Sequence, residues 1–121
     1  MTAMTTTEWL ASKDPKYRGE AKLLLTRIQD AAGSAEVSVD EHAILGFGHG
    51  RDGYPLVALT VRKDGLRLYA NIHVLAKNKT ALGKSLTGKS CVTFKRASDI
   101  DDKLLARIVR GSLAAKALCE E

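Results

Sequence analysis

The fold is decided by the stretch LTGKSCVTFKRASDIDD, residues 86–102. It opens on a Thr87–Gly88 turn signal, continues into a β-branched and aromatic run over residues 91–96, and ends in the cap-rich segment Ser98–Asp101. Turn residues followed by such a run predict a strand, and Ser or Asp before a 3.6-residue apolar period predicts a helix start. The stretch therefore predicts a strand over residues 91–96 and a helix from about Ile100.

The turn in this stretch also matches the letters of the phosphate-binding P-loop, from Gly83 to Gly88-Lys89-Ser90. A P-loop binds phosphate because a strand enters it and a helix leaves it, which aims helix N-terminal N–H groups at the ligand. Here a loop or short helix precedes the motif and a strand follows it. We therefore predict that this turn binds no nucleotide. The same argument removes a dinucleotide site at GHGRDG, residues 48–53, which a strand also follows.

Charge is distributed unevenly along the chain. The 121 residues carry a net charge of +5, with 45% hydrophobic and 27% charged residues, which is ordinary for one globular domain over residues 1–121. Residues 61–100 contain nine Lys and Arg against two Asp, so the rest of the chain is slightly acidic. This asymmetry points to an anionic partner, although a solubilising basic face would give the same composition.

Two features bear on the compartment. The two cysteines, Cys91 and Cys119, have no metal-ligand spacing and make no disulfide framework. The N-terminal residues lack an apolar signal core, and no stretch approaches transmembrane length. We therefore expect a cytoplasmic protein with reduced thiols and no membrane partner.

Helix signals lie towards both ends of the chain. Asp14 and Pro15 suit the N-cap and first position of a helix, and apolar residues follow the 3.6-residue period up to Gly33, which is placed to end it. A short turn of helix is expected after Thr5, and another short helix within residues 74–83. The first few residues are expected to be disordered.

Between the helices the pattern is that of strands. Three runs, residues 44–50, 56–62 and 66–72, are joined by Asp-Gly pairs that favour hairpins. The order α-α-β-β-β-α-β-α predicts an α+β fold, with an antiparallel sheet of about four strands and helices packed on one face. The other face of the sheet is then open to solvent or to a partner.

Strand alternation names the side chains of that open face. With Leu66, Leu68 and Ala70 facing the helices, the opposite face is basic and carries a tyrosine, which suits an anion, RNA or a protein. The expected partner-binding or anion-binding residues are Arg67, Tyr69, Asn71 and His73 on the third run, Thr93 and Lys95 on the fourth, and Lys89 in the turn before it.

A weaker candidate site is the cluster of Glu36, Asp40, Glu41 and His42. Three carboxylates and an imidazole could hold a hard or borderline metal weakly, although they lack tight ligand spacing and a polar loop is the alternative. No catalytic set stands out, because the three histidines are scattered and the aspartates before the last helix suit capping. The residue pattern therefore favours a binding protein over an enzyme.

Three segments, Ile44–Gly48, Leu56–Lys63 and above all Thr87–Asp101, resemble the YdhG-like family, catalogued as family 1801 of domains of unknown function. The similarity runs from about Tyr17 to Arg110. It implies a frataxin-like sandwich whose open sheet face docks on partners. It also implies iron handling, because some relatives are described as intracellular iron chaperones. Iron is thus the cofactor that the resemblance implies, and none follows from the residues themselves.

Three functions remain open from the sequence. The first is a frataxin-like iron-handling or partner-docking protein. The second is a binder of an anionic ligand or nucleic acid through the basic face. The last is an enzyme built around the Thr87–Ser90 turn. Frataxins carry an acidic ridge on the first long helix, whereas the corresponding helix here carries Lys16, Arg18, Lys22 and Arg27 against Glu20 and Asp30.

Overall fold

A five-stranded antiparallel sheet and two long helices make up the fold. The computed structural model describes residues 5–39 and 44–120. The strands are β1 (Val37–Val39), β2 (Leu45–Phe47), β3 (Val57–Arg62), β4 (Gly65–Tyr69) and β5 (Cys91–Phe94). The helices are α1 (Thr6–Ala11), α2 (Pro15–Ala32), α3 (Ile72–Lys77), α4 (Lys79–Leu82) and α5 (Asp102–Leu113), with 3-10 turns at Gly83–Ser85 and Ala97–Asp99. The predicted α+β class is confirmed.

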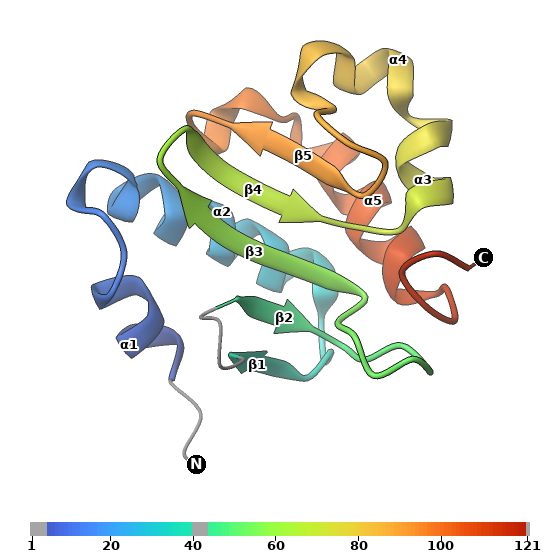
Figure 1. The fold of residues 1–121 in the computed structure, drawn as a ribbon, viewed down its shortest axis with the longest axis horizontal. Coiled ribbons are helices and arrows are strands. Elements are labelled where there is room, and N and C mark those ends of the chain that lie inside the picture. The colour runs from blue at the N-terminus through green and yellow to red at the C-terminus, as the bar shows by residue number, and fades with distance from the viewer. Residues whose placement is uncertain (1–4, 40–43, 121) are drawn as a thin grey trace.

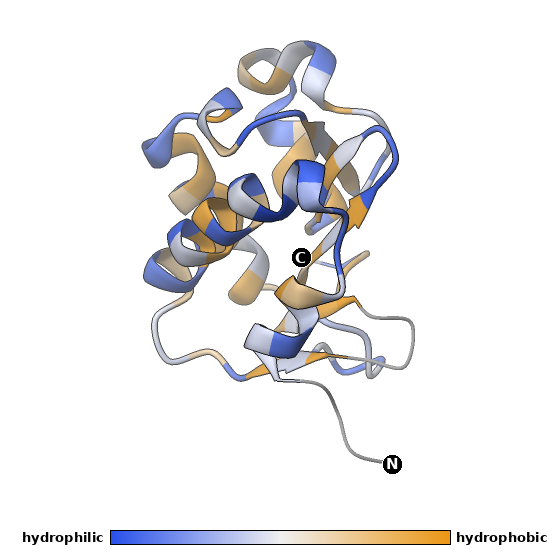
Figure 2. Ribbon diagram, turned by 90° about the vertical axis from the view of Figure 1, so that its left-hand side faces the viewer, coloured by the Kyte–Doolittle hydropathy of each residue, from blue (hydrophilic) through white to orange (hydrophobic). Residues whose placement is uncertain are grey.

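The molecule has two layers. Figure 1 shows the strands side by side in chain order with α2 and α5 passing behind them. In Figure 2, turned by 90°, the strands are mostly hydrophobic, and the helices carry both hydrophobic and hydrophilic residues. Fully buried side chains between the layers include Leu24 and Ile28 of α2, Ile108 of α5, and Leu45, Leu59, Leu68 and Val92 of the strands. Each such side chain contributes roughly 1.5–3 kcal/mol on burial, so the helix-covered face holds the core.

The helices α1, α2 and α5 begin at, or within two residues of, the predicted positions. Thr5 forms a capping box with Glu8, and the Asp14 carboxylate accepts a hydrogen bond from the Lys16 N–H at 2.9 Å, with Pro15 opening α2. Asp101 accepts from the Lys103 N–H at 3.0 Å and starts α5. Such caps contribute about 1 kcal/mol each, and the predicted capping role of this aspartate is confirmed.

Polar contacts fasten the segment before α5 to α2. The Arg27 guanidinium donates to the carbonyl of Ile100 at 2.7 Å and to the Asp102 carboxylate, also at 2.7 Å. It donates to the Ala97 carbonyl as well, and the Ala97 N–H donates to the Glu20 carboxylate at 2.8 Å. These contacts explain why the stretch that follows β5 turns across α2 before the last helix starts.

One strand was not predicted, and two predicted strands end earlier than expected. The sheet has five strands instead of about four, because β1, only three residues long, pairs with β2 and is too short to show a period. The run at 44–50 stops at Phe47, where Gly48 adopts φ 66°. The run at 91–96 stops at Phe94, because the Asp99 carboxylate accepts from the backbone N–H groups of residues 95 and 96, at 3.0 Å each, and bends the chain.

The strand predicted over residues 66–72 also ends early, at Tyr69. Residues 72–77 form α3 instead, which crosses close to α5. At the crossing, a Cβ added to Gly111 would lie 3.2 Å from Val74, so the glycine permits the close approach. Gly111 does not end α5, which continues to Leu113.

The chain ends in a segment, residues 114–120, that folds back against α3 (Figure 1). The Ile72 N–H donates to the Leu118 carbonyl at 3.1 Å, and Ala117 is only 2% exposed. Arg51 forms an ion pair with Glu120 at the same end of the molecule. No local pattern predicts this return, because the segment has neither a helical nor a strand period.

Two further expectations from the sequence concern disorder at the N-terminus and the absence of a membrane-spanning helix. The disorder expected for the first few residues falls mainly on residues 1–4, which lie outside the described part. Among the described residues, no helix has the length and apolar character needed to cross a bilayer.

Candidate functional site

The register of the sheet sets which side chains share its uncovered face. Arg67 on β4 lies opposite Thr60 on β3 and Thr93 on β5, and Tyr69 lies opposite Cys91. The neighbouring Leu68 points the other way and is fully buried against the helices. The alternation predicted for β4 and β5 is therefore confirmed at Arg67, Tyr69 and Thr93.

Only part of this face reaches solvent. On its β2–β3 half, Thr60 is 4% exposed and Ala58 6%, and Pro55 packs so closely on Gly46 that an added Cβ would lie 2.7 Å from its ring. The other half consists of four partly exposed side chains that we call the β4–β5 face: Arg67, Tyr69, Cys91 and Thr93. Any partner of the sheet must meet this half.

The side chain of Arg67 is only partly exposed on the β4–β5 face. Its guanidinium donates to the Asp64 carboxylate at 3.1 Å, and its Nε is buried with no hydrogen-bond partner among the described residues. The hydrogen bond to Asp64, followed by one to Tyr69, raises the pKa of Arg67, and the same bond to Arg67 lowers the pKa of Asp64. Part of the charge of Arg67 is thus balanced within the protein.

The turn before β5 folds back on the strand. The N–H groups of Thr87 and Gly88 both donate to the Cys91 carbonyl, at 3.1 and 3.2 Å, and the Thr87 and Thr93 hydroxyls are 2.9 Å apart. A 3-10 turn leads in and a strand leads out, as predicted, so these two N–H groups point at protein and not at a phosphate site. That the turn binds no nucleotide stays a prediction.

Asn71 is not on the open face, which corrects the prediction. It is 1% exposed, and its Oδ1 accepts from the N–H groups of His73 at 2.9 Å and Val74 at 3.2 Å. An asparagine that bonds the backbone two and three residues later starts a helix, and this local bond overrides strand alternation. The N–H groups of its amide donate to the C-terminal segment, so Asn71 has a structural role.

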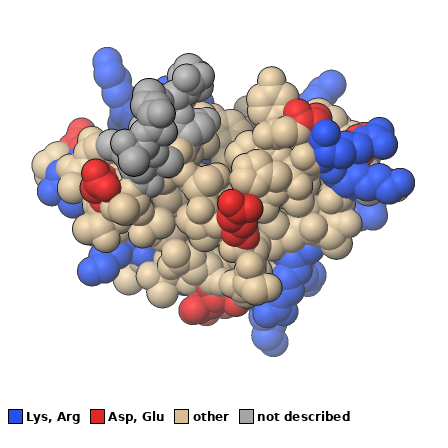
Figure 3. All heavy atoms as spheres, turned by 90° about the horizontal axis from the view of Figure 1, so that it is seen from below, with Lys and Arg blue, Asp and Glu red and all other residues tan. Residues whose placement is uncertain are grey.

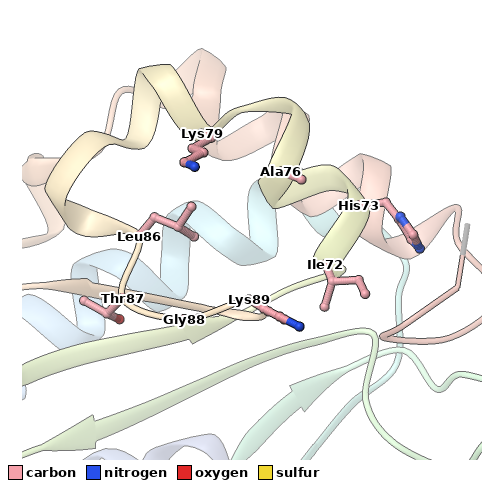
Figure 4. Close-up of a pocket in the computed structure, with 8 residues that line it drawn as sticks. All are labelled: Ile72, His73, Ala76, Lys79, Leu86, Thr87, Gly88 and Lys89. Carbon is pink, nitrogen blue, oxygen red and sulfur yellow. The ribbon is translucent and has the colours of Figure 1, made fainter.

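His73 is also misplaced by the strand prediction. It lies in the first turn of α3, its Nε2 is 3.2 Å from the Cys119 carbonyl, and Figure 4 shows its ring turned away from the neighbouring Lys79 and Leu86. The two remaining candidates, Lys89 and Lys95, are exposed just before and just after β5. They flank the β4–β5 face without belonging to a strand.

A cavity of about 630 Å³ lies beside this face, between the α3–α4 pair and the turn before β5 (Figure 4). Its lining residues are Ile72, His73, Ala76, Lys79, Leu86, Thr87, Gly88 and Lys89. Lys79 points from α4 towards the segment that carries Leu86. No local pattern in the sequence predicts this cavity, because the turn is brought under the two helices by its pairing with β5, through the bridge between Leu86 and Val92.

The predicted metal cluster is mostly outside the described residues. Asp40, Glu41 and His42 belong to the segment 40–43, while Glu36 is exposed. Within residues 5–39 and 44–120, no group of three or more His, Cys, Asp or Glu is placed to hold a metal ion. Iron binding at the predicted cluster therefore stays a prediction.

Charge differs from one side of the molecule to another. Figure 3 shows the side seen from below, where uncharged residues occupy most of the surface and Lys and Arg side chains project around its rim. Of the basic residues in the segment 61–100, Arg67 lies on β4, Lys89 and Lys95 flank β5, and Lys79 and Lys89 line the cavity.

Comparisons with family models, with curated proteins and with solved structures give no match for this chain. The resemblance to the YdhG-like family thus stays a prediction.

Proposed function

We propose that this protein binds single-stranded nucleic acid on the β4–β5 face. The observation that carries the proposal is the placement of Tyr69 beside Arg67 and Thr93 on a sheet face that no helix covers. A partly exposed aromatic ring such as Tyr69 can stack on an unpaired base, and neighbouring cations and hydroxyl groups can bind the phosphate and sugar. A flat face of this kind suits a single strand better than the groove of a duplex.

The electrostatic part of the proposal rests on the lysines at the two ends of β5. Lys89 and Lys95 are exposed, and neither forms an ion pair in the described part of the chain. Their ammonium groups are placed to neutralise phosphates on either side of Tyr69. After the hydrogen bond from Arg67, the charge of Lys95 also helps to lower the pKa of the Asp64 carboxylate. Arg67 contributes less, because Asp64 already balances part of its charge.

The iron-handling role implied by the family resemblance is the weaker candidate. No group of metal ligands supports it among the described residues, and the long helix α2 presents Lys22 and Lys16 to solvent. Docking on a protein partner would use the same β4–β5 face as a nucleic acid. A nucleic acid and a protein partner differ in how steeply their affinity for this face falls with salt concentration. The titrations below measure that difference.

Fluorescence anisotropy with a labelled single-stranded oligonucleotide tests the stacking contact. Tyr69→Ala should weaken binding by roughly 1–3 kcal/mol, the usual loss when a stacked base loses its aromatic partner, whereas Tyr69→Phe should retain most of the affinity. Tyr54→Ala is the matched control, because Tyr54 is 67% exposed but lies in the β2–β3 connection. Equal losses for Tyr69→Ala and Tyr54→Ala would contradict the proposal.

The same titration at several salt concentrations tests the lysines. The logarithm of the association constant should fall linearly with that of the salt concentration, with a slope of about −0.7 per phosphate neutralised. Lys89→Ala and Lys95→Ala should each make that slope less steep by about 0.7, and Lys22→Ala on α2 should not. Affinity without salt dependence, or binding only to a protein, would overturn the nucleic-acid proposal.

A further inference from the structure

The cavity between the α3–α4 pair and the turn before β5 has a mixed lining (Figure 4). Ile72, Ala76 and Leu86 are apolar, while Lys79 reaches in from α4 near Leu86 and Lys89 lies on the turn below Ile72. Its volume of about 630 Å³ falls within the roughly 300–1,000 Å³ typical of pockets for small molecules. The cavity thus matches a molecule with an apolar body and a polar end.

The polar end must be anionic. None of the eight lining residues is acidic, and neither Lys79 nor Lys89 has a carboxylate partner in the part of the chain that the structure describes. A cavity lined by two ammonium groups and no carboxylate has a positive potential, which attracts an anion.

The donors that face the cavity suit a carboxylate better than a phosphate. Phosphate sites use several converging backbone N–H groups, but those of Thr87 and Gly88 already donate to the Cys91 carbonyl. The His73 ring is engaged with the Cys119 carbonyl. The ammonium groups of Lys79 and Lys89 remain, and an ammonium group binds a carboxylate without the converging backbone N–H groups that a phosphate site uses.

We propose that this cavity binds a small organic carboxylate with an apolar body, its carboxylate at the ammonium group of Lys79 and its body against Ile72, Ala76 and Leu86. The site shares Lys89 with the proposed nucleic-acid surface, but Lys79 and the three apolar residues do not belong to that surface, so binding of the carboxylate does not depend on nucleic-acid binding. Salt should weaken the interaction, since both ammonium groups are exposed.

Calorimetric titration with 3-phenylpropanoate tests the proposal, with three matched probes. The neutral alcohol 3-phenylpropanol lacks the charge, propanoate lacks the apolar body, and inorganic phosphate offers a different anion. We expect 3-phenylpropanoate to bind at least about tenfold more tightly than each of them, because only it uses both the apolar and the charged lining of the cavity. Equal binding of the alcohol or of inorganic phosphate would overturn the proposal.

Variants locate the site. Lys79→Ala should weaken 3-phenylpropanoate binding about tenfold, as expected when a charge-assisted hydrogen bond is lost. Lys84→Ala is the control, because Lys84 is exposed in the adjacent 3-10 turn but does not line the cavity. Leu86→Ser should also weaken binding, while Tyr69→Ala should leave it unchanged, which separates this site from the β4–β5 face. An unchanged affinity in Lys79→Ala, with its melting temperature retained, would contradict the assignment.

Discussion

The side-chain amide of Asn71 donates a hydrogen bond to the backbone carbonyl of Ala117, 2.9 Å away, and so joins the start of α3 to the C-terminal segment. The same amide donates to the Glu120 carbonyl at 2.5 Å, while its oxygen accepts from the His73 N–H. One buried side chain therefore ends β4, starts α3 and holds the end of the chain in place. The wall that α3 contributes to the cavity depends on this junction.

Replacing Asn71 should therefore cost more stability than replacing an asparagine with fewer contacts. Asn71→Ala removes a helix cap and leaves buried carbonyls unpaired, so the free energy of unfolding should fall by about 2–4 kcal/mol. Asn78→Ala, which loses one hydrogen bond to the Val74 carbonyl, should cost about 1 kcal/mol. Urea denaturation measures both, and equal losses would show that Asn71 does not organise the junction.

The Arg67–Asp64 pair should leave a signature at acid pH. The pKa of Asp64 is lowered in the folded protein, chiefly by the hydrogen bond from Arg67. A lowered carboxyl pKa favours folding above the ordinary value of about 4, and that contribution is lost as the pH falls through the lowered value. In Arg67→Gln an NMR titration should find the pKa of Asp64 closer to the ordinary value. An unchanged pKa would contradict the pairing.

Nucleoside triphosphates should not bind at the Thr87–Ser90 turn. A strand follows the turn, and the N–H groups of Thr87 and Gly88 are occupied by the Cys91 carbonyl, so the backbone cradle of a P-loop cannot form there. Addition of ATP and Mg²⁺ should leave the melting temperature unchanged. A rise in melting temperature that disappears in Lys89→Ala would refute this prediction.

Iron should bind no more tightly than tens of micromolar, if it binds. The carboxylates of Glu36, Asp40 and Glu41 lack tight ligand spacing in the sequence, and dispersed carboxylates hold ferrous or ferric iron weakly. Calorimetry with ferrous iron under anaerobic conditions measures the affinity. Sub-micromolar binding that is lost when these three residues are neutralised would favour the iron-handling role instead.

The helices and strands whose apolar residues follow a regular period could be predicted from the sequence. The 3.6-residue period and the caps placed α2 and α5, and strict alternation placed Arg67 and Tyr69 on the open face. The prediction was wrong where one local hydrogen bond determines the backbone conformation. At Asn71 a side-chain amide ends the strand, although the alternation of apolar residues continues past it to Ile72.

Features that depend on tertiary contacts could not be predicted. Lys79 and Lys89 line one cavity only because the chain turns back at Leu86 and pairs with Val92. The C-terminal segment has no period at all, and its position depends on Asn71 and on the ion pair between Arg51 and Glu120. Such contacts join residues far apart in the chain, and no local pattern encodes them.

The most direct test of the proposed function is an NMR map of the backbone amides during titration with a single-stranded oligonucleotide at about 50 mM salt, where phosphate contacts are strong. If the β4–β5 face is the binding surface, the largest chemical-shift changes should lie at residues 67–69 and 91–95, and those on α2 should be small. Changes concentrated on α2, or no changes under these conditions, would contradict the assignment of single-stranded nucleic acid to this face.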